Sequence, residues 1–312
     1  MILVAGGTGR LGSIVVRDAV ASGRAVRVLT RSTSGAQHLG PGVEVITGDV
    51  RDADAVRRAV DGCDLVVSAV HGFTGSRANS PTSVDRDGNA NLIGAARAYG
   101  ADTILMSGVG AAPDSPIELF RMKWAAEQHA LHHGGPTTVI RATAFAELWI
   151  DLLRHTAARS GRPMVFGHGV NPINFVSVID VAALVALAVD DHTTRGEILE
   201  IGGPANVTIL ELAGMVQTAD GRDARPRHLP PLILRLARAT IGQLRPQIAR
   251  QTGMALALDH DDCTFDTTAI HQRFPTLPTT AITDLLAHDR PSPRANDQLP
   301  ESNTDHAEAG QS

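Results

Sequence analysis

The first twelve residues, MILVAGGTGRLG, constrain the fold of this chain more than any other segment. Residues 2–5 form a short apolar run with the length and composition of a buried parallel strand. Gly6, Gly9 and Gly12 follow, and glycines allow a sharp turn, a close approach to a pyrophosphate and close packing of the next helix. We predict that helix over residues 10–22, with its N-terminal N–H groups and positive dipole end facing the phosphates. A glycine-rich turn without a ligand is the alternative.

The end of the second predicted strand, residues 25–30, bears on the choice of cofactor. An NAD site places Asp or Glu about twenty residues after the glycines, where the carboxylate bonds the ribose 2′-hydroxyl. This chain has Arg31 there, and a guanidinium binds a 2′-phosphate in a bidentate manner. Arg10, inside the glycine loop, would add a second positive charge. We therefore expect NADP(H), with NAD(H) as the alternative because an exposed arginine is also an ordinary surface residue.

Composition excludes several classes of protein. The chain has 312 residues, of which 43% are hydrophobic, and a formal charge of −5. This suffices for one large α/β domain or for a domain with an appended lobe, and the mild acidity argues against a nucleic-acid partner. The longest strongly apolar stretch, 181–189, is too short to span a bilayer, so we expect no membrane partner.

Cysteine usage and the N-terminal residues favour a cytoplasmic protein. Cys63 and Cys263 lie far apart in the sequence and indicate no disulfide framework. No charged n-region or cleavage site precedes the first predicted strand, so we expect no signal peptide. The sequence leaves the oligomeric state open.

Strand and helix patterns alternate along the first half of the chain. Strands are predicted at 2–5, 25–30, 43–47, 64–70, 102–107 and 137–141, with helices at 10–22, 52–60, 84–99 and 117–133. This alternation predicts an α/β fold of the Rossmann type, a doubly wound parallel sheet with right-handed crossovers. We assign residues 1–160 to this NAD(P)-binding domain.

The second half of the chain predicts a smaller lobe. It contains predicted helices at 144–158, 178–190 and 208–219 and predicted strands at 163–166, 172–177 and 197–201. Thr208 and Glu211 form a capping box at the start of the last of these helices. We interpret residues 161–290 as a C-terminal substrate lobe that partly returns to the main sheet. Residues 291–312 hold one Leu and no other large apolar residue, which predicts a disordered tail.

Lys123 is the only lysine in the chain, since every other residue with a permanent positive charge is an arginine. A bias toward arginine that spares one position indicates a place where arginine fails. Lysine is a compact ammonium whose charge state responds to burial, which suits catalytic roles. The alternative is that one surface lysine remained by chance. Tyr99, the only tyrosine, lies near the end of the predicted helix 84–99 and not beside Lys123.

An ordered set of short motifs follows the predicted strands. Beyond the glycine motif, these are Gly48-Asp49-Val50, Ser68-Ala69-Val70, Ser107 and Lys123. The set resembles the short-chain dehydrogenase/reductase superfamily. Residues 175–182 (FVSVIDVA) and 201–204 (IGGP) look like its atypical branch, which includes the NAD(P)H-binding, NmrA-like and isoflavone-reductase-like proteins. The resemblance covers residues 1–220 well and 221–290 loosely.

The resemblance implies a Tyr-x-x-x-Lys pair that works with an upstream serine, and this chain has only part of it. Lys123 matches the lysine, but Leu119 occupies the tyrosine position and the adjacent Phe120 has no hydroxyl. This departure argues against ordinary alcohol oxidation. In one alternative, as in isoflavone-reductase-like relatives, Lys123 itself moves the proton. In the other, Lys123 only orients the nicotinamide ribose, and water or a ribose hydroxyl protonates a conjugated product.

The predicted site residues fall into three groups. The catalytic candidates are Lys123 and Ser107. The cofactor-binding candidates are Gly6, Thr8, Gly9, Arg10, Leu11, Gly12, Arg31, Asp49, Val50, Ala69, Val70, His71, Lys123, Thr143 and Phe145, and Arg141, Ala142 and Ala144 are also expected near the nicotinamide. A substrate wall is expected from Phe145, Trp149, Met164, Phe166 and Phe175.

Each of these predictions has an ordinary structural alternative. Ser107 and Asp49 also suit backbone caps at strand ends, His71 suits a loop, and the aromatic residues suit a core. His129, His132 and His133 share a helix face at a spacing that could hold zinc, but no carboxylate or cysteine partner is identified for them, which favours a solvated helix end. Residues 259–262 (DHDD) are interpreted as a charged loop, with a metal site as the alternative. We expect no metal, and no nucleophile elbow or phosphate-binding lysine loop supports a hydrolase or an NTPase.

The sequence favours an NADP(H)-dependent oxidoreductase. Hydride would pass between the nicotinamide and an apolar conjugated or carbonyl small molecule, such as a quinone or an enone. The alternative is a non-catalytic NAD(P)-binding redox sensor or regulatory protein, which the missing tyrosine makes a serious rival.

Overall fold

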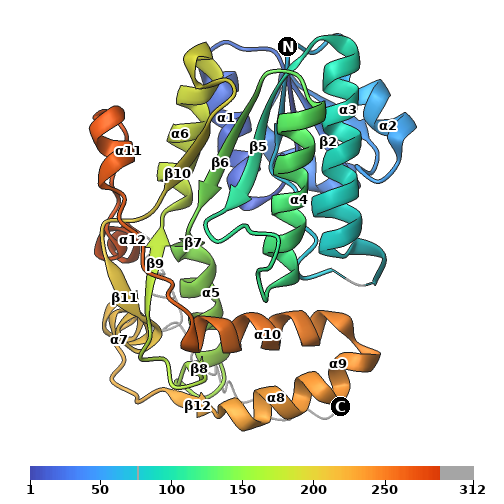
Figure 1. Ribbon diagram of the computed structural model, residues 1–312. Helices are drawn as coiled ribbons and strands as arrows, with labels where there is room; N and C mark the ends of the chain where they lie inside the picture. Colours follow the sequence, from blue (N-terminus) through green and yellow to red (C-terminus); the bar gives the residue numbers. More distant parts are fainter. Residues whose placement is uncertain (76, 289–312) are drawn as a thin grey trace, which may run out of the picture.

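The computed structural model describes residues 1–75 and 77–288 (Figure 1). The tail predicted over 291–312 lies outside the described residues. The central sheet has seven strands in the order β10-β6-β5-β4-β1-β2-β3, and every neighbouring pair is parallel. The strands are β1 Ile2–Ala5, β2 Val26–Thr30, β3 Val43–Thr47, β4 Leu65–Ser68, β5 Asp102–Gly108, β6 Thr137–Ala142 and β10 Ile198–Ile201. The predicted doubly wound parallel sheet is confirmed.

Helices cover both faces of this sheet (Figure 1). They are α1 Arg10–Ala21 and α6 Val178–Asp190 on one face, and α2 Ala53–Val60, α3 Asn89–Tyr99 and α4 Glu118–His133 on the other. Side chains of β1 alternate between the two cores: Ile2 and Val4 pack with α1 and α6, and Leu3 and Ala5 pack with α2 and α3. Because both faces are buried, this strand is apolar throughout instead of alternating.

The predicted helix over 84–99 is interrupted near its start. Residues Thr82–Gly88 form a π-helix, and regular α3 begins only at Asn89. The wider π turn places the carboxyl group of Asp85 in the interior, where the residue has 0% exposure. Asn89 donates its side-chain amide to the backbone carbonyl of Asp85 at 2.7 Å and so holds the wider turn in place. Short 3-10 helices also span Thr33–Leu39, Arg77–Asn79 and His192–Thr194.

The remaining elements form a smaller lobe with its own apolar core, except that Ile270, in the last helix but one, packs in the core of the main sheet. They are β7 Ala144–Phe145, β8 Met164–Phe166, β9 Pro172–Val176, β11 Asn206–Thr208, β12 Arg227–Leu229, α5 Ala146–Ala157, α7 Ile209–Ala219, α8 Pro231–Ala239, α9 Ile241–Leu244, α10 Pro246–His260, α11 Thr268–Arg273 and α12 Ile282–His288. The predicted capping box of Thr208 and Glu211 is present at the start of α7. Ile150 of α5 packs in the lobe core, whereas α6 and β10 join the main sheet. The division at residue 160 stays a prediction.

Helices α8, α9 and α10 form a layer beyond the carboxyl ends of the main strands (Figure 1). Met1, at the start of β1, marks the opposite edge. Arg250 of α10 ties the layer to the loop after β4, because its guanidinium donates to the carbonyls of Phe73, at 3.1 Å, and of Gly75. Within residues 1–75 and 77–288, no helix combines the length and apolarity needed to cross a bilayer.

Candidate active site

The glycine turn after β1 is packed too tightly for side chains at two positions. Gly6 has a φ of +83°, and a Cβ there would lie 2.7 Å from the carbonyl oxygen of Ala69, just past β4. A Cβ on Gly12 would lie 2.2 Å from the carbonyl oxygen of Gly6. Gly6 therefore makes the turn, and Gly12 lets α1 pack onto it, as the sequence predicts. Gly9 is less tightly enclosed than these two, because a Cβ there would lie 3.2 Å from the carbonyl oxygen of Gly6.

The start of α1 offers backbone donors with no competing acid. Gly9 is the N-cap residue, so no side chain caps the helix, and no acidic residue lies in the first turn. The turn lies between β1 and β4, where the strand order reverses, which is the usual ligand site of such sheets. Thr8 is exposed beside Gly35, whereas the side chain of Leu11 is buried in the core and leaves only its amide to the turn. This end of α1 can therefore hold an anion through N–H groups.

Two arginines predicted to bind the 2′-phosphate have side-chain partners. Arg31 is exposed and donates to the side-chain oxygen of Asn79 at 3.3 Å. Arg10 forms an ion pair with Asp151 of α5, which connects the glycine turn to the smaller lobe. Arg31 therefore presents a positive charge beside the end of β2, while Arg10 is already paired.

Asp49, predicted beside the adenine, is held by a neighbouring arginine. Both carboxylate oxygens accept from the guanidinium of Arg51, at 2.8 and 2.6 Å. The hydrogen bond from Arg51 holds the pKa of the Asp49 carboxyl below its usual range, and Arg31 adds to the effect. Val50 is buried, and its carbonyl accepts from Asn91 at 2.9 Å. The pairing with Arg51 offsets much of the repulsion that the Asp49 carboxylate would exert on a phosphate.

Lys123 is paired with a carboxylate that the sequence did not indicate. Its Nζ lies 3.3 Å from Oδ1 of Asp85 and donates to the carbonyl of Met106 at 3.1 Å. Lys123 is 9% exposed and Asp85 is fully buried. The second carboxylate oxygen of Asp85 accepts the backbone N–H of Gly72 at 2.7 Å. This buried pair fixes the Lys123 side chain at the ends of β4 and β5.

His71 lies next to this pair, directly before Gly72. The residue is exposed to solvent, but protein atoms near the ring desolvate it in part. Desolvation and then the positive charges of Lys123 and Arg31 lower the pKa of His71, although Asp85 opposes them. The lowered pKa favours the neutral imidazole. In that form the ring can donate or accept a hydrogen bond but carries no positive charge.

Ser107 carries a hydroxyl without a partner. Its Oγ is buried and forms no hydrogen bond to any residue in the described ranges. Buried polar atoms are nearly always satisfied, so an unsatisfied hydroxyl at the carboxyl end of β5 indicates a place for a ligand. Met106, whose carbonyl holds Lys123, directly precedes it. The sole tyrosine lies at the other edge of the sheet, because Tyr99 ends α3 just before β5 begins at Asp102, whereas Ser107 lies near the end of β5.

The residues at the end of β6 are occupied by structural contacts. Arg141 donates to both oxygens of the buried Glu127 carboxylate, at 2.9 and 2.6 Å, and also pairs with Glu200. The hydrogen bonds that Arg141 donates to the Glu127 carboxylate raise the pKa of Arg141. Thr143 donates its hydroxyl to Asn174 at 2.9 Å. Phe145 is half-buried against the main core. The guanidinium of Arg141 is thus committed to the sheet and is not free for the nicotinamide.

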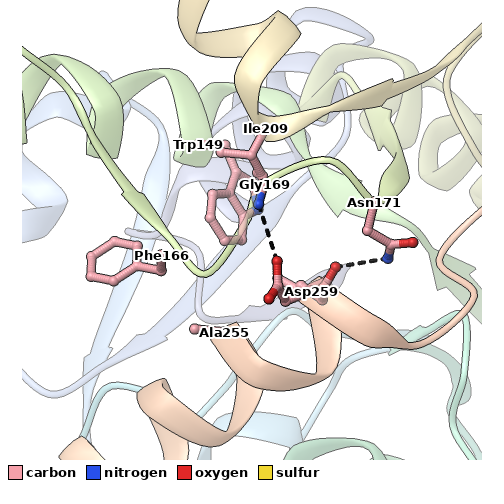
Figure 2. Close-up of a pocket in the computed structure, with 8 residues that line it drawn as sticks. Trp149, Phe166, Gly169, Asn171, Ile209, Ala255 and Asp259 are labelled. Atoms are coloured by element: carbon pink, nitrogen blue, oxygen red, sulfur yellow. Dashed lines mark hydrogen bonds between the residues drawn. The ribbon is translucent and has the colours of Figure 1, made fainter. Parts of the chain in front are cut away.

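The predicted substrate wall is divided by the structure. Phe175 is 1% exposed and packs edge-on against Trp149 in the lobe core. Trp149 and Phe166 line a small pocket under α10 (Figure 2). Its volume is about 20 Å³, enough for one water but not for an organic substrate. Trp149 and Phe175 therefore pack in the lobe core, which was the alternative for them.

Asp259 closes this pocket and ties α10 to the loop after β8 (Figure 2). Its carboxylate accepts the backbone N–H groups of His168, at 2.7 Å, and Gly169, at 3.0 Å, and lies 2.8 Å from the His168 ring. Burial raises the pKa of Asp259, but these hydrogen bonds outweigh burial and lower it overall. Across the described part of the chain, no three His, Cys, Asp or Glu side chains gather as a metal site would require.

Comparisons with known proteins identify a family for this chain and find a similar fold among solved structures. Residues 1–251 match the sequence model of the NmrA-like family. The NAD(P)H azoreductase of Xenophilus azovorans is 29% identical over 229 residues, which cover 72% of this chain and 76% of that protein. The photosystem II assembly factor Ycf39 of Synechocystis is 26% identical over 243 residues, 76% of this chain and 73% of that protein. The NADPH complex of an NADPH-dependent quinone oxidoreductase from Escherichia coli has a TM-score of 0.72 and 21% identity, covering 92% of this chain and 99% of that one.

Proposed function

We propose that this chain, which belongs to the NmrA-like family, is an NAD(P)H-dependent oxidoreductase. The family resemblance drawn from the sequence is confirmed. One observation carries the proposal: the glycine turn, the buried Lys123–Asp85 pair and the unpartnered Ser107 hydroxyl all lie at the carboxyl edge of one parallel sheet. Sheets of this kind bind ligands at that edge.

The glycine turn fits a nicotinamide dinucleotide. The spaces that Cβ atoms would fill at Gly6 and Gly12 allow the backbone to fold tightly, and the uncapped start of α1 presents its amides. We assign the pyrophosphate to the amides of residues 9–12 and the nicotinamide ribose to Lys123. When bound, the nicotinamide supplies the hydride chemistry. The azoreductase relative is named for NAD(P)H, which supports the assignment.

We assign NADP(H) over NAD(H) on the charge beside β2. Arg31 is exposed there, and Asp49, the nearest acid after β3, is paired with Arg51. A guanidinium attracts a 2′-phosphate, and no unpaired carboxylate of the kind that selects NAD follows β2. The side chain of Asn79, which accepts from Arg31, would share in this subsite.

The ion pair with Asp85 favours the second of the two roles considered for Lys123. An ammonium held by a buried carboxylate and a carbonyl is a fixed donor, which suits binding the ribose hydroxyls. Ser107 would donate its free hydroxyl to a carbonyl oxygen of the substrate. A conjugated acceptor such as a quinone gains hydride at one end and takes its proton from water, so it needs no tyrosine.

The decisive experiment follows NADPH oxidation against a panel of quinones, azo compounds, enones and aldehydes. We expect turnover with at least one conjugated acceptor and its loss in Ser107→Ala, with the Kd for NADPH retained. Ser115→Ala, another buried serine, is the matched control and should turn over normally. Tight NADPH binding without turnover of any acceptor would refute the proposed oxidoreductase activity.

A non-catalytic NAD(P)-binding regulator is the second candidate. The absence of a second tyrosine and the Synechocystis relative, which is named as an assembly factor, favour it. This candidate predicts that NADPH binding changes the protease sensitivity or the hydrogen exchange of the loop at residues 72–75 while the panel stays unreacted.

A further inference from the structure

The α8–α9 segment exposes an unusual number of large apolar side chains. Five of them lie within residues 232–244: Leu232, Ile233, Leu236, Ile241 and Leu244. Leu244 is 83% exposed and Leu232 is 74% exposed, the two highest values among the large apolar residues of the described chain. We call these five residues, with Arg235 and Arg245 beside them, the α8–α9 surface. A cluster of this kind marks an interaction site more often than a plain surface.

Three of these side chains share one side of α8 because of helical spacing. Leu232, Ile233 and Leu236, at positions i, i+1 and i+4, lie together and are exposed. Leu234 points the other way and is 1% exposed, since α8 packs on α10. The apolar side formed by Leu232, Ile233 and Leu236 is therefore separate from the side of α8 that packs on α10. In Figure 1, α8 lies in the outermost layer of the molecule, beyond α10.

The net charge of the segment that contains α8 and α9 is positive, whereas the net charge of the rest of the chain is negative. Residues 224–258 contain six arginines and no Asp or Glu. The rest of the chain has 22 of the 28 basic residues and all 33 acidic ones, and is strongly acidic. In the ranges that the structure describes, Arg235 and Arg245 form no salt bridge. An apolar stripe flanked by unneutralised arginines on an acidic protein is complementary to a negatively charged surface.

We propose that the α8–α9 surface docks on an anionic lipid bilayer. Helices that lie in a membrane interface carry apolar residues on one side and arginine or lysine at its borders, and they need no spanning length. Hydropathy alone led to the expectation of no membrane contact because it reports spans. A second copy of this surface fits less well, since two arginine-rich faces repel each other.

The geometry allows the bound protein to stay folded as it is. α8 packs along α10, and α10 is fixed at both ends, by Arg250 on the loop after β4 and by Asp259 on the loop after β8. Docking would thus bring the lipid surface to the lobe that covers the carboxyl edge of the sheet. A lipid-soluble acceptor would then be near the proposed site, although docking itself does not depend on the enzyme activity.

Vesicle sedimentation tests the proposal. The full chain is mixed with phosphatidylcholine vesicles that contain about one third phosphatidylglycerol, and with pure phosphatidylcholine vesicles. We expect binding to the anionic vesicles, at least tenfold weaker binding to the neutral ones, and release at about 1 M salt, where charge is screened. Leu232→Gln/Leu236→Gln/Leu244→Gln and Arg235→Gln/Arg245→Gln should each weaken binding at least tenfold.

A matched control separates docking from nonspecific adhesion. Leu131, on α4, is also exposed, so Leu131→Gln should bind vesicles as the natural protein does. Circular dichroism and NADPH affinity verify that the variants are folded. Absence of vesicle binding, equal binding to neutral vesicles, or a dimer in light scattering that the triple Gln variant dissociates would each overturn the proposal.

Discussion

Two buried aspartates, Asp85 at the carboxyl edge of the main sheet and Asp259 in the smaller lobe, are held in similar ways but left in different states. Both accept backbone N–H groups from a glycine-containing loop. Asp259 has donors for both of its oxygens, from His168 and Gly169. Oδ1 of Asp85 accepts no hydrogen bond from the described residues, and among them only the Nζ of Lys123, at 3.3 Å, forms an ion pair with it. A fully satisfied carboxylate stabilises a loop, whereas a partly satisfied one beside the sole lysine leaves an ammonium available for a ligand.

Lys123→Ala should produce the largest effect. It removes the only ammonium at the proposed ribose site and leaves the Asp85 carboxylate buried without its partner. We expect kcat/KM to fall about 100-fold or more, in the range of a lost positioning contact to the reacting group. Lys123→Arg should reduce kcat/KM nearly as much, because the larger planar guanidinium does not fit the position of a compact ammonium. Steady-state kinetics measure both, and unchanged kcat/KM in the alanine variant would contradict the assignment.

Asp85→Asn tests whether the pair matters for function or only for folding. The amide keeps the size and the Gly72 contact but removes the charge opposite Lys123. We expect kcat to fall about tenfold and the free energy of unfolding to fall by about 3 kcal/mol, as for a broken buried pair. Urea unfolding and the pH dependence of kcat measure the two effects. A lower stability with an unaltered kcat and pH profile would make Asp85 purely structural.

Asp259→Asn makes the same chemical change in the other region. We expect a loss of about 2 kcal/mol in unfolding free energy, because charged hydrogen bonds to two N–H groups are weakened. The KM for NADPH should stay unchanged, since α1 and β1 lie elsewhere. A kinetic defect as large as that of Asp85→Asn would remove the contrast between the two carboxylates.

The natural protein and the Asp259→Asn variant also provide a test based on pH. The folded chain lowers the pKa of Asp259, so the unfolded chain binds a proton there more readily. The stabilisation is complete above the unfolded pKa of about 3.9 and is lost as pH falls through the lower folded value. The natural protein should therefore lose its stability advantage over Asp259→Asn in acid. A difference in melting temperature that stays constant from neutral pH into strong acid would exclude this origin.

Arg31→Ala should give the smallest effect, confined to one cofactor. We expect the Kd for NADPH to rise about tenfold, or about 1.4 kcal/mol, with the Kd for NADH unchanged. Arg57, an exposed arginine on α2 paired with Asp54, supplies the control variant Arg57→Ala. Calorimetric titration measures both affinities. Equal affinities of the natural protein for the two cofactors would withdraw the preference.

Sequence patterns predicted the fold because its main signals are local. The apolar run of residues 2–5, the glycine turn and the alternation of strands and helices each act within a few residues, and the structure confirms them. Lys123 stood out through its rarity in the composition. Asp85 gave no signal, since it is one of 33 acidic residues and only the π turn carries it inside. Arg141 lay near the expected edge, but its contacts with Glu127 depend on how α4 packs.

The sequence by itself determined where the chain turns, which strands are buried and which residue types are rare, because those properties depend on neighbouring residues and on period. The tertiary structure decided which polar groups meet. It paired Lys123 with Asp85, left the Ser107 hydroxyl unsatisfied and turned the apolar side of α8 outward. Such pairings join residues from separate elements, and hydrogen bonds and burial take effect only when packing brings those elements within a few ångströms.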